Sequence, residues 1–175
     1  KTPLPTAGPS KPSIRPESSL LTPLPDSQDV QFNKEIMIDK NDIPIDDSIE
    51  SIKTRKKVIY DFYQEWKYAN PLMRRYNLSL KDYINIRHVS IDETSAHASK
   101  KYLSTLAVLQ LDAILTYAKR KKITISKAGI KNQKMFEKMI VMEYDCPGIG
   151  MVKLTVGVRK TTHEKIQYCI TALEI

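Results

Sequence analysis

Three stretches near the C-terminus alternate between apolar and polar residues with a period of two. They cover residues 135–145, 151–159 and 165–173, and the connections between them, 146–150 and 160–164, are of hairpin length. Such alternation is typical of strands that bury one face of a sheet. The last third of the chain therefore predicts an antiparallel β-meander, and the rest of the chain must supply whatever covers its apolar face.

A long amphipathic helix is predicted ahead of these strands. It begins at the capping-box-like pair Asp47 and Glu50 and ends near Asn70-Pro71, where proline opposes continuation. Its apolar stripe consists of Ile52, Ile59, Phe62, Tyr63 and Trp66. Its basic residues are expected on the outer surface, and they are Lys53, Arg55, Lys56 and Lys57.

Further elements are predicted between this helix and the meander. Residues 83–89 resemble a short strand in which His88 is structural, and the capping box from Ser90 to Glu93 opens a second helix. Residues 103–119 form the strongest helical pattern, closed by the cations of 119–122. Helices followed by antiparallel strands predict an α+β fold, with the helices on one face of the sheet.

The chain divides by composition into an arm and one domain. Eight of its ten prolines lie in the first 44 residues, so we expect an extended proline-rich arm over 1–45 and a basic α+β domain over 46–175. Residues 1–50 carry a net charge of −4 and the remaining 125 carry +12. A domain of this charge attracts polyanions. The arm is expected to lie on the domain of its own chain or on other protein subunits.

Several classes of protein are excluded. The sequence has no apolar run of about 18 residues, so no membrane span is expected. Cys146 and Cys169 are the only cysteines, and no His or Cys residues stand at ligand spacing, so neither a disulfide framework nor a metal site is predicted. No pattern for a small-molecule cofactor is present.

The period-two pattern also sorts the side chains of the meander. The residues predicted to face the helices are Phe136, Ile140, Met142, Tyr144, Val152, Leu154, Val156, Val158, Ile166, Tyr168, Ile170 and Ala172. The opposite, polar face is predicted to hold Glu137, Glu143, Lys153, Thr155, Arg159, Gln167, Cys169 and Thr171. An ordinary solvent-facing sheet surface predicts the same pattern.

The polar face also has the residue types that RNA cleavage without a metal requires. That reaction needs a base for the 2′-hydroxyl, an acid for the leaving oxygen, and cations for the phosphate. Glu137 or Glu143 is the candidate base, and His163 or His97 is the candidate acid. The candidate phosphate ligands are Lys153 and Arg159, and the residues expected to position substrate are Gln167 and Thr171.

Residues 91–118, together with 152–159 and 167–171, resemble the barnase/EndoU/colicin/RelE-like nuclease superfamily. The resemblance is to the versions found in polyvalent proteins of phages and conjugative elements. It implies roles for His97, Ser99 and Lys100 in the helix. In the strands it implies roles for Lys153, Arg159 and Thr171, and RNA contacts are expected from Lys100, Lys101, Thr155 and Gln167.

The resemblance implies a metal-independent endoribonuclease from a phage or mobile element, located in a virion or in the host bacterial cytoplasm. Some relatives carry a histidine in the last strand, where this chain has Gln167 and Tyr168, and RNA binding without cleavage is therefore an alternative. A second alternative is a virion structural or cargo protein whose residues 1–45 bind other subunits. A third is an anionic-surface binder that uses the lysines of the first helix.

Overall fold

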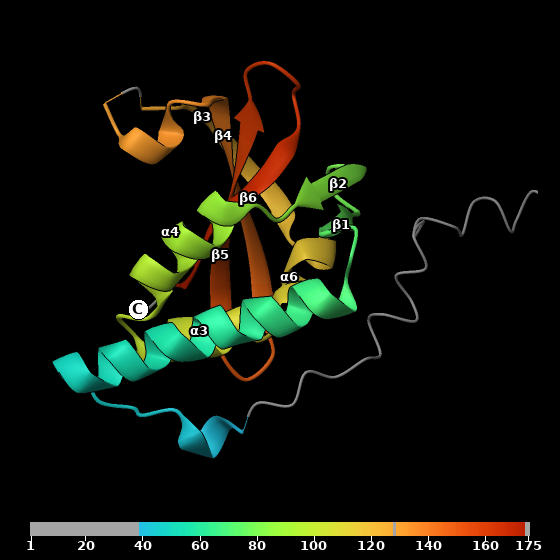
Figure 1. Cartoon of the computed structure of the whole chain (residues 1–175). Coiled ribbons are helices and arrows are strands. Elements are labelled where there is room, and N and C mark those ends of the chain that lie inside the picture. Colours follow the sequence, from blue (N-terminus) through green and yellow to red (C-terminus); the bar gives the residue numbers. More distant parts are fainter. Residues whose placement is uncertain (1–38, 128, 174–175) are drawn as a thin grey trace, which may run out of the picture.

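The computed structural model describes residues 39–127 and 129–173, so most of the predicted proline-rich arm lies outside the described residues. The helices are η1 (Lys40–Asp42), α3 (Ile49–Ala69), α4 (His88–Ala98), α5 (Tyr102–Val108), α6 (Leu111–Tyr117) and η2 (Lys131–Gln133). The strands are β1 (Arg74–Asn77), β2 (Asp82–Asn85), β3 (Lys119–Ile125), β4 (Phe136–Cys146), β5 (Gly150–Arg159) and β6 (Lys165–Ala172). The predicted α+β fold is confirmed (Figure 1).

The six strands form one mixed sheet in the order β1-β2-β6-β5-β4-β3. The predicted meander is its antiparallel centre, β4-β5-β6. Of the other three strands, β2 coincides with the first part of the strand predicted at 83–89, whereas β1 and β3 were not predicted. Strand β2 joins the meander through a single parallel register pair, Asn85 with Ile166, and β3 pairs antiparallel with β4.

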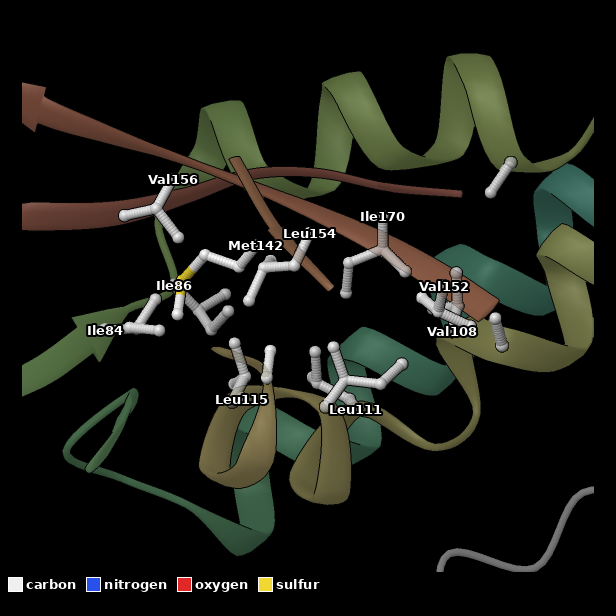
Figure 2. Close-up of a cluster of buried hydrophobic side chains, with 14 of the residues drawn as sticks. Ile84, Ile86, Val108, Leu111, Leu115, Met142, Val152, Leu154, Val156 and Ile170 are labelled. Carbon is white, nitrogen blue, oxygen red and sulfur yellow. The ribbon is translucent and has the colours of Figure 1, made fainter. Parts of the chain in front are cut away.

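The helices bury one face of this sheet. Ile59, Tyr63 and Trp66 of α3 are inaccessible to solvent and pack in the main core. Figure 2 shows Leu111 and Leu115 of α6 directed at the strand residues of that core. The strand residues labelled there are Ile84, Met142, Val152, Leu154, Val156 and Ile170. The main core therefore lies between the helices and the meander, as the sequence predicts.

Two β-bulges change the predicted sorting of the meander. The register shifts between Phe136 and Lys138 in β4, and again beside Tyr168 in β6. Beyond these bulges the apolar side chains change face. Phe136, Ile166 and Tyr168 therefore leave the main core and form a second cluster with Val89 and Met139. They still contact a helix, through Val89 of α4, but in a cluster separate from the main core.

Phe136 lies against Gly157 in this second cluster. A Cβ atom built on Gly157 would lie 2.7 Å from the Phe136 ring, a distance that real Cβ contacts do not show. Phe136 and Tyr168 meet edge to face, with ring centroids 6.0 Å apart. The glycine therefore provides the space in which the bulged strand buries its aromatic residue.

The predicted strand at 83–89 is also wrong in its second half. It ends at Asn85, and His88 is the first residue of α4. The backbone N–H of Arg87 donates to the Ser90 hydroxyl, so Ser90 lies inside the first turn and does not precede the helix. His88 is exposed at this end and pairs with Asp92, with 3.0 Å between Nε2 and Oδ2.

The predicted single helix at 103–119 is two short helices. Three consecutive residues, Leu106, Ala107 and Val108, are buried at the end of α5, which one face of a straight helix cannot accommodate. The break after Val108 lets α6 turn a new apolar face to the core. The cations of 119–122 do not close a helix, because they belong to β3.

The start of α3 differs from its prediction as well. Ser48 is the N-cap, and its hydroxyl accepts from the backbone N–H of Ser51 at 3.2 Å. Arg55, predicted on the outer surface, is fully buried. It donates to the carbonyl oxygens of Pro44 and Ser99 at 2.9 and 2.8 Å, and so ties residues that precede the helix to the turn after α4.

Asp46 makes a pH-dependent contribution to the stability of the fold at the start of α3. Hydrogen bonds from the side chain and backbone of Ser48, and from the Ser51 hydroxyl, lower the pKa of Asp46 from 3.8 to about 2. The stabilisation is complete above pH 3.8 and is lost as the pH falls through about 2. We expect Asp46→Asn to lower the melting temperature near neutral pH. This difference in melting temperature should shrink as the pH falls from 3.8 to about 2. Thermal unfolding followed by circular dichroism measures it, and a constant difference down to pH 2 would contradict it.

Candidate functional site

A concave pocket of about 500 Å³ lies between β2 and the turn that joins β5 to β6. This turn is at one end of the meander, beside β2 (Figure 1). We call the concavity the hairpin pocket. The polar residues that line it include Arg74, Asp82, Tyr83, Asn85, Arg87, His163, Glu164 and Lys165.

The hairpin fixes His163 at the pocket. The backbone N–H of His163 donates to the Arg159 carbonyl at 2.9 Å, and the N–H of Arg159 donates to the Glu164 carbonyl at the same distance. His163 has φ of 60°, in the left-handed region that few residues other than glycine occupy. Its Nδ1 lies 3.3 Å from Oε1 of Glu137 on β4. The hairpin thus holds an exposed imidazole against a carboxylate.

Glu164 joins two guanidinium groups at the same place. Arg87 donates from Nη2 to one carboxylate oxygen of Glu164, and Nε of Arg159 lies 4.0 Å from the other. Among the described residues, this buried Nε has no hydrogen-bond acceptor. A pair of guanidiniums around one carboxylate leaves N–H donors for a second anion.

The opposite wall of the pocket is aromatic and cationic. Cζ of Arg74 lies 3.9 Å from the centroid of the Tyr83 ring, a cation–π arrangement. Tyr76 and Tyr83 meet edge to face, with ring centroids 5.4 Å apart. The Tyr83 ring is therefore held in a fixed orientation at the pocket.

Lys165 and Asp82 connect the two walls. Nζ of Lys165 donates to Oδ2 of Asp82 at 2.7 Å, and the side chain of Asn85 donates to the Lys165 carbonyl at 3.1 Å. Partial burial raises the pKa of Asp82, but hydrogen bonds from Lys165 and from the backbone of Tyr83 outweigh it, so the net pKa is lowered. Asp82 is thus held as the charged partner of Lys165.

Other predicted site residues lie together elsewhere, on the polar face of the meander. The register aligns Glu143, Lys153 and Thr171 across β4, β5 and β6, and Thr155 lies two residues from Lys153 on the same face. Nζ of Lys121 lies 3.5 Å from Oε1 of Glu143. The side chains of Glu143, Lys153 and Thr171 therefore form a row across the three strands, as the period-two alternation predicts.

Helix α4 adds a second titratable group beside this row. Nε2 of His97 lies 3.4 Å from Oε1 of Glu93, and Asn132 donates to the other carboxylate oxygen. Cys169 donates to the Glu93 carbonyl, with 3.8 Å between sulfur and oxygen. Burial, and then the Glu93 charge, raise the pKa of the Cys169 thiol to about 12, so the thiol stays protonated near neutral pH.

The predicted catalytic residues therefore fall into two groups. Six residues of β5 separate Lys153 from Arg159, which is about 20 Å along a strand. Glu143 is separated from Glu137 by the same number of residues on β4. The β5–β6 hairpin thus brings His163, Arg159 and Glu137 together beside the hairpin pocket, which His163 alone of the three lines, whereas Glu143, Lys153 and Thr171 lie away from it.

Gln167 is on neither surface. It is fully buried on the helix side of the sheet, where its Oε1 accepts from the Tyr63 hydroxyl at 2.6 Å. Its Nε2 donates to the Thr94 hydroxyl at 2.7 Å. Burial raises the pKa of the Tyr63 phenol, which stays a donor. The bulge at Tyr168 moves Gln167 to this face, and its predicted place on the polar face is wrong.

Lys100 and Lys101 follow α4 and lie near the start of α3. Nζ of Lys101 pairs with Oδ2 of Asp47 at 3.2 Å, and the Lys100 carbonyl accepts from Arg55 at 3.3 Å. Neither residue lines the hairpin pocket. Their contacts in this structure belong to the joint between α3 and α4.

Sequence reasoning missed the residues of β1 and β2 that line the hairpin pocket. A signal was present in Tyr83, Asn85 and Arg87, which alternate with Ile84 and Ile86. This period-two run predicts one buried and one polar face. Its polar face is the wall of the pocket, and both isoleucines are fully buried.

Within 39–127 and 129–173, no group of three or more His, Cys, Asp or Glu side chains is arranged to hold a metal ion. In those ranges, none of the helices has the length and apolar character required to span a bilayer. No protein-family model, curated protein or solved structure matches the chain.

Proposed function

We propose that the chain binds single-stranded RNA at the hairpin pocket and cleaves it there by a metal-independent reaction. The observation that carries the proposal is that His163, Arg87 and the fixed Tyr83 ring line one concavity, while Glu137 and Arg159 lie against its lining residues His163 and Glu164. These are the groups that proton transfer, phosphate binding and base stacking require.

The two walls of the pocket suggest how a nucleotide lies in it. Arg87 and Arg159 have planar N–H donors suited to a phosphodiester, and their side chains are 38% and 36% exposed. The Tyr83 ring, held by Arg74, offers a surface against which a base can stack. A phosphate near Arg87 would place the adjoining base toward Tyr83.

The acid and base are assigned from the histidine pair. Glu137 accepts the proton of the ribose 2′-hydroxyl, whose oxygen attacks the adjacent phosphorus. The bond from phosphorus to the 5′-oxygen breaks, and protonated His163 donates its proton to that oxygen. The charge that develops on the phosphoryl oxygens is stabilised by Arg87 and Arg159. The products are a 2′,3′-cyclic phosphate and a 5′-hydroxyl.

Glu164 has a positioning role in this scheme. Its carboxylate is bound by Arg87 and lies next to Arg159, so its oxygens are directed at the two guanidiniums. Asp82 holds Lys165 in the same way on the neighbouring wall. Both carboxylates set the orientation of cations, and neither is assigned a proton-transfer step.

We expect the full chain to cleave a single-stranded RNA oligonucleotide in the presence of EDTA, because all of the assigned groups are side chains. The products should carry 2′,3′-cyclic phosphate termini, detectable by mass spectrometry. An RNA with 2′-O-methyl at every position should bind with similar affinity and stay intact. Intact RNA at several pH values, with binding retained, would indicate a domain that binds RNA without cleavage.

Absence of both binding and cleavage would contradict the proposal. The role of a virion structural or cargo protein would then be the better one. The source in a phage or mobile element stays a prediction from the sequence resemblance.

A further inference from the structure

Strand β3 forms the edge of the sheet opposite to β1 and β2, where the hairpin pocket lies. All seven of its residues are exposed, and β4 is its one partner strand among the described residues. Residues 119–136, which begin with this strand, contain seven Lys or Arg and no Asp or Glu. This edge therefore carries a concentrated positive charge.

A second pocket, of about 590 Å³, lies where β3 begins. Tyr117 and Tyr144 line it with stacked rings, 6.4 Å between centroids and 24° between planes. Tyr117 is 45% exposed, and Met151 adds an apolar surface that is 38% exposed. We call this concavity the tyrosine pocket.

Three consecutive cations form the rim of the tyrosine pocket: Lys119, Arg120 and Lys121. Its lining also includes the carboxylates Glu143 and Asp145, and Glu143 pairs with Lys121 at 3.5 Å. In a regular strand, neighbouring side chains would point to opposite faces. Here the register shifts between Arg120 and Lys122, so Lys121 is the extra residue of a bulge. A bulge changes the direction of the side chains around it, so adjacent residues can line the same pocket.

We propose that the β3 edge and the tyrosine pocket form a second binding site for single-stranded nucleic acid. The backbone phosphates contact the three cations of the rim, with Lys121 exchanging its Glu143 partner for phosphate, and one base lies against Tyr117 and Met151. An extended acidic peptide would also be attracted by the charge. The stacked tyrosines and the apolar wall favour nucleic acid, because its bases provide flat apolar partners that carboxylate side chains lack.

This site is independent of cleavage and does not rest on the proposed function. It is tested with the full chain and a fluorescently labelled deoxythymidine 12-mer, which has no 2′-hydroxyl. We expect the triple variant Lys119→Gln, Arg120→Gln, Lys121→Gln to raise the Kd by about tenfold or more at low salt. The slope of log affinity against log salt should fall by about 2, the value for three lost phosphate contacts of a single strand.

A matched control has the same change of charge on α3. Lys53, Lys56 and Lys57 are exposed there, and their triple replacement by glutamine should change the Kd much less. Circular dichroism melting verifies that both triple variants are folded. Equal losses from the two variants would overturn the proposal, because charge alone would then account for binding.

The contribution of the base is tested by Tyr117→Leu, which keeps an apolar side chain and removes the ring. We expect the Kd to rise by about 5- to 150-fold, the usual range for one stacked base, with an unchanged salt slope. An unchanged Kd, together with equal competition by an oligoglutamate of the same charge, would overturn the proposal in favour of an acidic peptide.

Discussion

Replacing His163 by asparagine is expected to lower the rate of RNA cleavage by about 10²- to 10⁴-fold, the usual contribution of a general acid. Asparagine tolerates the left-handed backbone at this position, where φ is 60°, so the hairpin should be preserved. The RNA Kd should change little, because the phosphate contacts are assigned to Arg87 and Arg159. Single-turnover cleavage of a labelled RNA separates the rate from binding.

His97→Asn is the matched control for this prediction. His97 also contacts a carboxylate, at 3.4 Å from Glu93, but it lies on α4 beside the polar face of the meander. We expect its cleavage rate to stay near that of the unaltered chain. A large loss from His97→Asn with none from His163→Asn would move the site to the polar face.

The largest expected effect on stability is that of Arg55→Ala. Arg55 is fully buried, and its N–H groups donate to the carbonyl oxygens of Pro44, Asp46 and Ser99. Removing it leaves these carbonyl oxygens, of which that of Ser99 is buried, without the Arg55 donor, and opens a cavity at the joint of α3 and α4. We expect the free energy of unfolding to fall by about 3–5 kcal/mol, as when one partner of a buried charged network is removed.

Urea unfolding of the full chain measures this loss. Lys56→Ala is the control, because Lys56 is the next residue of the same helix and is exposed. Its expected effect is within about 0.5 kcal/mol. A loss from Arg55→Ala below about 1 kcal/mol would show that water or neighbouring groups satisfy the carbonyl oxygens equally well.

The part of the fold that could be predicted from the sequence is the part governed by local pattern. The three long strands of the meander and the 21-residue helix α3 have a periodicity that each segment carries by itself. The charge run of β3 has no such signal, because an exposed edge strand needs no alternation. The pairing of β3 with β4 is a tertiary contact, and the helical pattern of the residues before β3 gives no sign of it.

The candidate site was less predictable for a related reason. The residues His163, Arg159 and Glu137 come from the meander, and its hairpin brings them together as the strand pattern anticipates. The other wall comes from β1 and β2, whose place beside β6 depends on one parallel register pair. A bulge, such as the one that buries Gln167, also has no signature in the apolar pattern.

The parallel joint between β2 and β6 has a consequence for how the chain folds. The contacts that close the hairpin pocket, Arg87 with Glu164 and Asp82 with Lys165, join residues 77 and 83 positions apart. Chain closure over such a separation carries a large entropic cost, and it precedes any compensating contact. The two hairpins of the meander close over far shorter loops. We therefore expect the walls of the pocket to meet late in folding, after the hairpins of the meander have closed.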